Sequence, residues 1–556
     1  MTSLSGSQRP VALVILGVTA ALVLLPGLGN HDLWAPDEPH YGQVSREMMT
    51  SGDWLLPHVN GRIYTDKPPG WFWCAALLSL PGGDVTPLTA RLPSALAALA
   101  LLLLVAAWGE RRLGAGSGTR AAVVLASTFL FFDLGRSAHL DMLLALLVTL
   151  SLLAGREVIA EGGGRGGRLL FWLAAGLGVL VKGPLALLLP LLVVTVDRLL
   201  VARRPRDLLR LQPWWGLPLA LALPLGWLLA VSATRPGYDP LTVINRHVLS
   251  RFGSGLHHAQ PFWYFGVQFF LELMPWGFLM PVAALAAWHF GATSRTAERE
   301  DEAGVPVPGR DRRRFLVIWV VVILLFFSVS KEKRGLYIMP LVPAAALLVA
   351  DFWHRLRTGD QRSGWMVRGG LGVIAALFMA LGVLPLALAR RPVAGAPGLE
   401  TLSLVLAVLG VGGGCAVLVS LLRRRLPAAL RLTAATFLAL LLVYAHGLQP
   451  TLDTVRSARG LAQELGRQLQ PGDPVAMLEW RAAYLYYSGV RMEELGNDEA
   501  AVAWMAAPGG RRLLLLRGEA WERLRPRMGT VQELGSHGTG PRRVLLLERP
   551  AGPPPA

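Results

Sequence analysis

Apolar runs of about 20 residues recur along this chain, and they set the strongest limit on how it can fold. They extend from Val11 to about Leu448, 53% of the 556 residues are hydrophobic, and the mean hydropathy is +0.45. A helix of about 20 residues crosses the hydrocarbon core of a bilayer, where every backbone polar group must be paired within the segment. The sequence therefore predicts an all-α polytopic membrane protein, not a soluble domain.

The positive charge of the chain is distributed in a way that predicts its orientation. A net charge of +17 is compatible with nucleic-acid binding. The arginines, however, gather in alternate connections between apolar runs, for example at Arg203, Arg204 and Arg206. The positive-inside rule assigns such connections to the cytoplasm. We therefore interpret the charge as a topology signal, expect no nucleic-acid partner, and place the N-terminus in the cytoplasm.

Segmentation by hydropathy predicts about 13 spans, with ends placed to within a few residues. The predicted spans are 11–29, 87–107, 120–133, 141–155, 168–182, 184–201, 212–232, 268–289, 314–329, 335–352, 367–388, 400–421 and 429–447. Together they make residues 1–448 a transmembrane domain.

Three substantial segments fall on the predicted outer side. The long connections 30–86 and 233–267 are expected to form the active site, and the first contains amphipathic stretches suited to the membrane interface. Polar residues return after Gln449, so residues 449–549 are predicted to form a small extracytoplasmic α/β domain. Residues 550–556 are predicted to be a disordered tail.

Acidic residues on the outer connections are the first candidates for chemistry. Asp37 and Glu38 follow the first apolar run, and Asp141 begins a later run next to His139. A partly buried carboxylate at such a place can act as a general base. Each also has a structural interpretation, because Asp37 and Glu38 can be a solvated acid pair and Asp141 can cap a helix.

Cations on the same side are the second candidates. Lys67 precedes two prolines, which keep its backbone extended, although a lysine here can also snorkel at the interface. Lys331, Lys333 and Arg334 oppose the positive-inside bias, and a compensating anion such as a lipid phosphate would explain them. Arg251 on the second long connection points the same way. Lys182, in a very short outer turn, is interpreted as a snorkelling residue.

Other catalytic patterns do not occur in the sequence. There is no glycine-rich phosphate loop and no His-Glu-x-x-His motif. Several predicted spans carry no ionisable residue, which argues against an ion-coupled transporter.

The order of the motifs resembles that of a known family. The segment 52–69 reads GDWLLPHVNGRIYTDKPP, and it is followed by HLD at 139–141, KGP at 182–184 and SKEK at 330–333, with YI at 337–338. Over residues 10 to about 350 this pattern is similar to the aminoarabinose transferase branch of the GT-C glycosyltransferases, which are related to protein O-mannosyltransferases.

The resemblance implies a GT-C fold, a polyprenyl-phosphate sugar donor, and an acceptor hydroxyl on the outer face of the plasma membrane. It assigns catalysis to Asp37 and Asp141 and the donor phosphate to Lys67. With the residues singled out above, the predicted substrate-binding set is Glu38, Tyr64, Asp66, Lys67, His139, Arg251, Lys331, Lys333, Arg334 and Tyr337. Some family members hold a metal at a site that Asp66 could join with His446, but the sequence itself indicates no required metal or cofactor.

The reaction expected from these residues is a single displacement with inversion at the anomeric carbon. Asp37 would orient or deprotonate the incoming hydroxyl, and cations would stabilise the departing phosphate. The acceptor is left open among a lipid A-like lipid, an envelope glycan and a protein. The alternative is a lipid-linked glycan flippase or ligase, which would share the basic loops but would not need Asp37 and Asp141 together beside Lys67.

The topology can be tested with reporter fusions. Arg204 belongs to an arginine-rich connection and Asp453 follows the last predicted span, so fusions after these two residues should lie on opposite sides of the membrane. A phosphatase that is active only outside and a fluorescent protein that matures only inside would measure this. Both fusions on one side would contradict the predicted arrangement.

Overall fold

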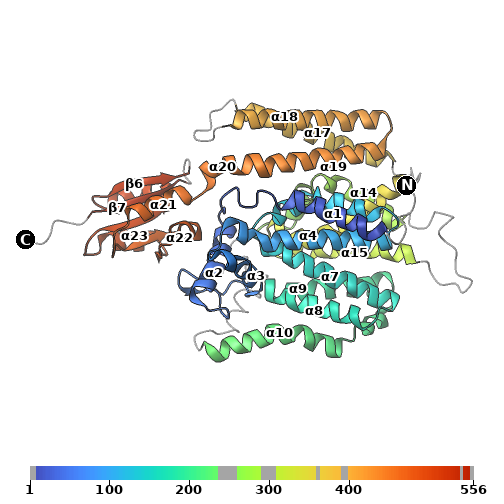
Figure 1. Ribbon diagram of the computed structural model, residues 1–556, viewed down its shortest axis with the longest axis horizontal. Helices are drawn as coiled ribbons and strands as arrows, with labels where there is room; N and C mark the ends of the chain where they lie inside the picture. Colours follow the sequence, from blue (N-terminus) through green and yellow to red (C-terminus); the bar gives the residue numbers. More distant parts are fainter. Residues whose placement is uncertain are drawn as a thin grey trace, which may run out of the picture.

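The computed structural model describes residues 8–235, 259–289, 308–357, 364–389, 398–538 and 543–550. Long helices pack side by side into an elongated body, and a small mixed α/β unit extends from one end (Figure 1). Helix α1 (Gln8–Leu24) starts from the far end of the helical body, away from this unit. The helix α19 (Leu426–Val443) runs along the body and leads toward the unit through α20 (Gln449–Arg456).

Within the described residues, seven helical segments are long and apolar enough to cross a bilayer, and there are eight if a bent pair counts as one span. The bent pair is α5 (Ser117–Ala126) with α6 (Phe129–Gly135), which meet at 71°. The seven are α4 (Pro87–Arg112), α7 (Leu140–Glu161), α10 (Pro213–Thr234), η6 with α16 (Gly335–Leu341 and Val342–Arg357), α17 (Gly364–Ala389), α18 (Leu399–Leu422), and α19 with its continuation through η7 (Tyr444–Leu448).

Further helices occupy most of the remaining predicted spans. They are α8 (Arg165–Lys182), α9 (Leu185–Val196) with η2 (Asp197–Val201), α13 (Tyr264–Glu272), η5 (Trp276–Phe278), α14 (Met280–His289) and α15 (Pro308–Val329), and η3 (Pro205–Leu211) precedes α10. Each predicted span thus falls on helical residues, but the count of about 13 crossings stays a prediction.

Two of the predicted spans are broken for identifiable reasons. The span 268–289 is interrupted at Pro275, which has no backbone N–H to continue the helical hydrogen bonds. The span 120–133 bends after α5, where Ser127 Oγ donates to the carbonyl of Val123 and Thr128 Oγ1 to that of Val124. Side chains that bond the preceding turn in this way compete with the helix backbone. Hydropathy alone does not register either break.

The first long connection, residues 30–86, folds into α2 (Asp37–Ser51), a hairpin of β1 (His58–Val59) and β2 (Arg62–Ile63), and α3 (Gly70–Ser79) followed by η1 (Leu80–Gly82). The two helices pack on each other through an aromatic cluster. Tyr41 of α2 lies 5.7 Å from Trp71 and 5.9 Å from Phe72 of α3, measured between ring centroids. This apolar contact fixes α2, and with it Asp37, over the ends of the helical body.

A buried arginine of α4 holds the start of this connection in place. Arg91 is 0% exposed, and its guanidinium donates to both carboxylate oxygens of Glu38 at 2.8 and 2.9 Å. It also donates to the carbonyls of Leu28, His31 and Asp32. Burial alone would raise the pKa of Glu38, but the Arg91 charge and its hydrogen bonds lower it to about 2. Both partners are therefore charged at every physiological pH.

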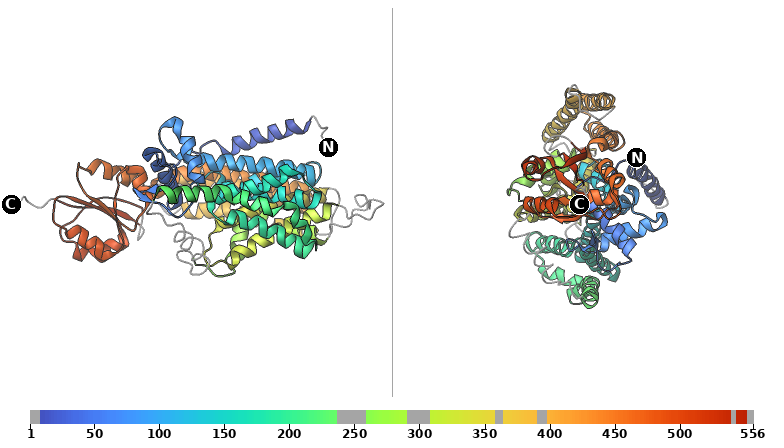
Figure 2. Two further views of the ribbon diagram at one scale, coloured as in Figure 1. Left: turned by 90° about the horizontal axis from the view of Figure 1, so that it is seen from below. Right: turned by 90° about the vertical axis from the view of Figure 1, so that its left-hand side faces the viewer.

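The small unit is a five-stranded sheet in the order β4-β3-β5-β7-β6, with helices beside it (Figure 2). Strand β3 pairs in parallel with β4 and β5, whereas β7 pairs antiparallel with β5 and β6. The strands are β3 (Val475–Leu478), β4 (Glu493–Leu495), β5 (Arg512–Arg517), β6 (Gln532–His537) and β7 (Val544–Arg549), and the helices are α21 (Arg459–Gln468), α22 (Ala482–Ser488), α23 (Asp498–Ala506), α24 (Gly518–Leu524) and η8 (Arg525–Arg527). The predicted tail after residue 550 lies outside the described residues.

Specific hydrogen bonds join the segment after Gln449 to the first long connection. Asp453 accepts from the Trp34 ring N–H at 2.7 Å and from the Asp32 N–H at 2.9 Å. Farther along, the Tyr487 hydroxyl accepts from the Leu33 N–H, and the Asn60 side chain pairs with the backbone of Met492. The segment that carries Asp37 is therefore held from both sides.

Breaking the Arg91–Glu38 pair should destabilise the protein strongly. Either Arg91→Met or Glu38→Gln leaves one buried charge without its partner, which typically costs about 3–5 kcal/mol. The measurement is the unfolding midpoint of the purified protein in detergent. The double variant should lose less than the sum of the two single variants.

The control is Arg467→Met, which breaks an exposed pair with Glu464 and should cost no more than about 1 kcal/mol. Equal losses for the buried and exposed pairs would refute a stabilising role for Arg91.

Candidate active site

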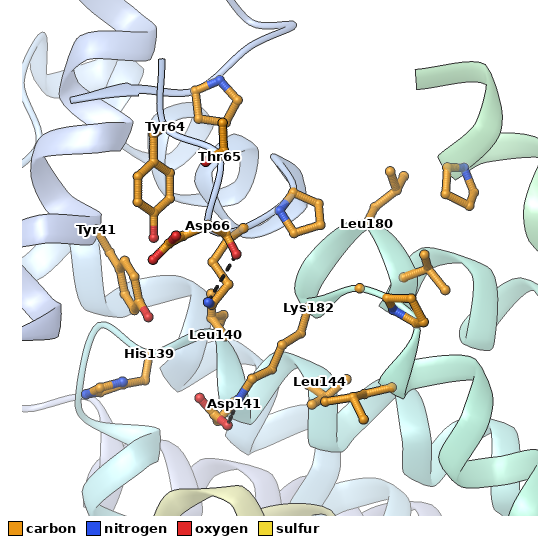
Figure 3. A pocket seen from close by; sticks show the side chains of 18 of the residues that line it. Tyr41, Tyr64, Thr65, Asp66, His139, Leu140, Asp141, Leu144, Leu180 and Lys182 are labelled. Atoms are coloured by element: carbon orange, nitrogen blue, oxygen red, sulfur yellow. Dashed lines mark hydrogen bonds and ion pairs between the residues drawn. The ribbon is translucent and has the colours of Figure 1, made fainter. Parts of the chain in front are cut away.

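A cavity of about 640 Å³ lies where the first long connection, residues 30–86, meets the ends of the membrane helices. Its walls come from α2, the segment after β2, the start of α7, the α8–α9 turn, α10, and the segment around η6. One part of the wall is charged, and another is apolar, with Leu144, Leu188 and Leu225 among its residues. Figure 3 shows Tyr41, Tyr64 and Asp66 on one side and Asp141 with Lys182 on another.

Asp37 opens α2 and faces the turn before η6. Its Oδ2 accepts a hydrogen bond from Arg334 Nη2, and His139 Nδ1 lies 3.9 Å from the same oxygen. The Asp37 side chain is 17% exposed, so a ligand in the cavity can reach it. All three residues line the cavity, and they derive from parts of the chain about 100 and 300 residues distant in sequence.

The Arg334 pair controls the charge of Asp37. Burial by itself raises the pKa of Asp37, but the hydrogen bond from Arg334, together with the charges of His139 and Arg334, brings the pKa below its ordinary value. Asp37 is therefore a carboxylate at neutral pH and can accept a proton or a hydrogen bond from a hydroxyl group. The same contact raises the pKa of Arg334, although burial opposes it, so the guanidinium stays charged.

Asp141 forms the second acid–base pair. It lies in the first turn of α7, is 3% exposed, and accepts a hydrogen bond from Lys182 Nζ at the end of α8 (Figure 3). The Lys182 ammonium also lies 4.9 Å from the ring centroid of Tyr337, a cation–π contact. Lys182 thus does more than the snorkelling considered from the sequence, because it lines the cavity and its ammonium pairs with Asp141.

Lys67 follows the β hairpin and also lines the cavity. Its Nζ donates to the carbonyl of Asp66 at 3.1 Å. Tyr64 lines the same wall, and its ring lies 5.0 Å from that of His40. Neither His40 nor Tyr41 stands among the residues predicted from the sequence, yet both line the cavity. Asp37, His40 and Tyr41 stand at positions i, i+3 and i+4, which lie on one face of a helix. This spacing could have indicated from the sequence that His40 and Tyr41 belong to the site of Asp37.

A second cavity of about 370 Å³ adjoins the first. The two share His139, Arg334 and Leu336, so Asp37 and Arg334 lie at the boundary between them. Asp133 and Glu272 line the second cavity and do not line the first.

The turn from Lys331 to Arg334 does not form the single cationic cluster that the sequence predicts. Lys331 is exposed and lines neither of these cavities. Lys333 Nζ donates to two backbone carbonyls, including that of Gln260 at 3.0 Å, and Arg334 bonds Asp37. Successive side chains of a turn point in different directions, so the three cations reach different partners. The anion that compensates Arg334 is a carboxylate of the chain itself.

Three other predicted site residues are not placed on the cavity walls. Glu38 faces away from the cavities toward Arg91, and it also accepts from the Ala138 N–H at 2.9 Å. His446 packs against the segment at Gly27. Arg251 lies outside the described residues, as does most of the second long connection, residues 233–267.

The described part of the chain contains no group of three or more His, Cys, Asp or Glu side chains arranged to hold a metal ion. Asp66 lines the first cavity while His446 lies off its walls, so these two do not form a site together. The donor set present here does not fit a metal, and no chemical step is assigned to one.

Known proteins match this chain over most of its length. Residues 66–229 match the family described as Dolichyl-phosphate-mannose-protein mannosyltransferase. The undecaprenyl phosphate-alpha-4-amino-4-deoxy-L-arabinose arabinosyl transferase of Pseudomonas aeruginosa is 35% identical over 414 residues, which cover 73% of this chain and 70% of that protein. The protein of the same name from Edwardsiella ictaluri is 32% identical, covering 69% and 67%.

The chain belongs to this family of arabinosyl transferases. It is accordingly a multi-pass membrane protein and a glycosyltransferase, as the sequence motifs predicted. The crystal structure of ArnT from Cupriavidus metallidurans bound to undecaprenyl phosphate has a TM-score of 0.76 with 21% identity, covering 98% of both chains. The apo structure gives 0.74 with 22% identity. At 21–22% identity, the likeness to these two structures shows a shared fold alone.

The Asp37–Arg334 pair predicts a change in pH dependence. In Arg334→Met the hydrogen bond and the charge are lost while burial remains, so the pKa of Asp37 should rise. If the carboxylate is the active form, the acid limb of kcat/KM should move to higher pH. Arg334→Lys, which keeps the charge, should move it less. An acid limb that stays in place in Arg334→Met would show that Asp37 does not govern it.

Proposed function

We propose that the protein transfers a sugar from a polyprenyl-phosphate donor to an acceptor hydroxyl on the outer face of the plasma membrane. The observation that carries this proposal is the first cavity, whose wall combines four carboxylates and three cations with an apolar surface. A donor with a phosphate head and a hydrocarbon tail has the same two parts. The relatives named above carry undecaprenyl phosphate in their names, and this agrees with the cavity.

The apolar part of the cavity suits a polyprenyl chain. It is lined by side chains of α7, α8, α9 and α10, such as Leu180, Leu221 and Trp227. Helix α10 lies at the edge of the helical body (Figure 1), and many of its side chains are exposed. A groove beside such a helix can open to the lipid, where a hydrocarbon chain enters without leaving an apolar environment.

In the proposed reaction the bond between the anomeric carbon and the phosphate oxygen breaks as the acceptor oxygen forms its bond. Asp37 orients the hydroxyl and takes its proton, and a single displacement inverts the anomeric carbon. The departing phosphate gains negative charge, which Lys67 and Lys182 are placed to stabilise in a partly buried site. Because Lys182 starts out bonded to Asp141, phosphate binding would weaken that pair and leave Asp141 to contact the sugar.

The proposed orientation puts the N-terminus in the cytoplasm, and the active site and the unit after Gln449 outside. Arg111 and Arg112 at the end of α4 lie far from the cavity along that helix, as the positive-inside rule requires. Membrane lipids surround the helices, and no nucleic acid is involved. Lipid A-like lipids, envelope glycans and proteins remain the candidate acceptors, and the relatives do not separate them. No metal or other cofactor is proposed to be required.

A lipid-linked glycan flippase or ligase is the second candidate. Such a protein would need the apolar groove and the cations, but it would not need a carboxylate kept ionised next to a cation. The Asp37–Arg334 pair favours the transferase.

The test is transfer in vitro from a purified polyprenyl-phosphate sugar, compared with the corresponding nucleotide sugar. Asp37→Asn removes the charge but keeps the size, so turnover should fall by roughly 10²- to 10⁴-fold while donor binding is retained. Lys67→Ala should instead weaken donor binding. Transfer from the nucleotide sugar alone, or normal turnover in Asp37→Asn, would overturn the proposal.

Lys331→Ala is the matched control, because Lys331 is an outer cation that does not reach the cavity. Its activity should equal that of the wild type. A loss as large as that of Lys67→Ala would return Lys331 to the phosphate site.

A further inference from the structure

The stretch of chain that leads into α2 is held by α20, the helix between the helical body and the small unit (Figure 1). Asp453 of α20 accepts two hydrogen bonds from this stretch, one through each carboxylate oxygen. The ring N–H of Trp34 donates to Oδ1 at 2.7 Å, and the backbone N–H of Asp32 donates to Oδ2 at 2.9 Å. Trp34 and Asp32 lie 419 and 421 residues before Asp453, so the contact forms only when distant parts of the chain come together.

Neighbours of this carboxylate contact the same stretch. The guanidinium carbon of Arg456 lies 4.4 Å from the ring centroid of Trp34, a cation–π contact. Ser457 Oγ donates to one side-chain oxygen of Asp32 at 2.6 Å, and Arg459 Nη1 donates to the other at 3.2 Å. The stretch is therefore held through its backbone and its side chains at once.

The held residues lead directly to the carboxylate proposed to take the proton. The backbone N–H of Trp34 donates to Glu38 Oε2 at 3.1 Å, and Asp37 lies between these two residues in the sequence. The Oδ2 of Asp37 accepts a hydrogen bond from Arg334. A shift of the start of α2 would therefore change both the place where Asp37 meets a hydroxyl group and its contact with Arg334.

Arg91 holds the same stretch through a different set of groups. Its guanidinium donates to the carbonyl of Asp32 and to Glu38, whereas Asp453 accepts from N–H groups. Asp32 is thus bonded at both its carbonyl and its N–H. Loss of the Asp453 contact would leave the Arg91–Glu38 pair intact, so we expect the protein to stay folded while the start of α2 gains freedom.

We propose that Asp453 is a positioning residue for the transfer reaction, because it sets the place of the Asp37 carboxylate by holding Asp32 and Trp34. The proposal rests on the proposed function. It adds a residue that lines neither of the two cavities to those on which turnover depends. Turnover is sensitive to such a residue, because displacing a reacting group by about 1 Å can slow a reaction roughly 10²-fold.

The experiment measures transfer from a polyprenyl-phosphate sugar by purified Asp453→Asn over a range of pH. The amide offers one acceptor oxygen in place of two, and the two donors bind different oxygens, so one hydrogen bond should be lost. We expect kcat to fall roughly ten- to hundredfold. The KM for the donor, and the binding of polyprenyl phosphate without a sugar, should stay at the wild-type values because Lys67 and Lys182 take no part in this contact.

The acid limb of kcat separates a positioning role from a folding defect. A smaller folded fraction lowers kcat equally at every pH and leaves the acid limb in place. Burial raises the pKa of Asp37, and the hydrogen bond and charge of Arg334 oppose this rise. If Asp37 is loosened from Arg334, its pKa should rise, and the acid limb of kcat should move to higher pH.

Trp34→Phe is an independent second variant, because it removes the ring N–H and keeps an aromatic ring beside Arg456. It should lower kcat and move the acid limb in the same direction. The double variant Trp34→Phe/Asp453→Asn should lose less than the product of the two single losses. The matched control is Asp498→Asn, which makes the same change at an exposed ion pair with Arg523 in the small unit and should keep the wild-type kcat and acid limb.

The outcomes separate the positioning role from the proposed function. A wild type that transfers no sugar from the polyprenyl-phosphate donor would overturn the proposed function and the role of Asp453 with it. A wild-type kcat in Asp453→Asn, or a lower kcat with an unmoved acid limb, would overturn the positioning role alone and leave the transferase in place. If Asp453→Asn does not fold, the pH profile of Trp34→Phe decides between the same two results.

Discussion

The fully buried Arg91 guanidinium is the contact on which the position of the active site depends. It binds Glu38 through both carboxylate oxygens and ties down the carbonyls of residues 28, 31 and 32. Glu38 in turn accepts from the N–H of Ala138, three residues before Asp141. One ion pair thus connects the segment that carries Asp37 to the segment that carries Asp141. A buried pair of this kind contributes little net stability over an apolar substitute, but losing one partner is costly.

The parts of the site that depend on short segments could be predicted from the sequence. The run of motifs around Asp37, Lys67 and Asp141 marks the walls of one cavity, and the structure brings all three residues to it. Their place on connections between membrane helices followed from hydropathy, which acts over about 20 residues, and so did the helical membrane fold. The family followed from the resemblance of the motifs, and the outer side of these connections stays a prediction.

The pairing of these residues could not be predicted, because it joins distant segments. Nothing near Asp141 in sequence indicates Lys182, and nothing near Asp37 indicates Arg334. The sequence therefore suggested a free cationic cluster at 331–334, whereas the structure directs each cation to a different partner. The bend inside the predicted span 120–133 was missed for a related reason, since it arises from side-chain hydrogen bonds that a hydropathy average does not contain.

The Arg334 side chain gives the two cavities different electrostatic roles. On one side, Lys67 and Lys182 provide the positive charge that a phosphate requires, and on the other, Glu272 has no described cation paired with it. In the proposed reaction the lysines bind the donor phosphate, while Asp37, which Arg334 holds at the boundary with the second cavity, receives the acceptor hydroxyl. Donor binding and acceptor choice can therefore be determined by separate surfaces.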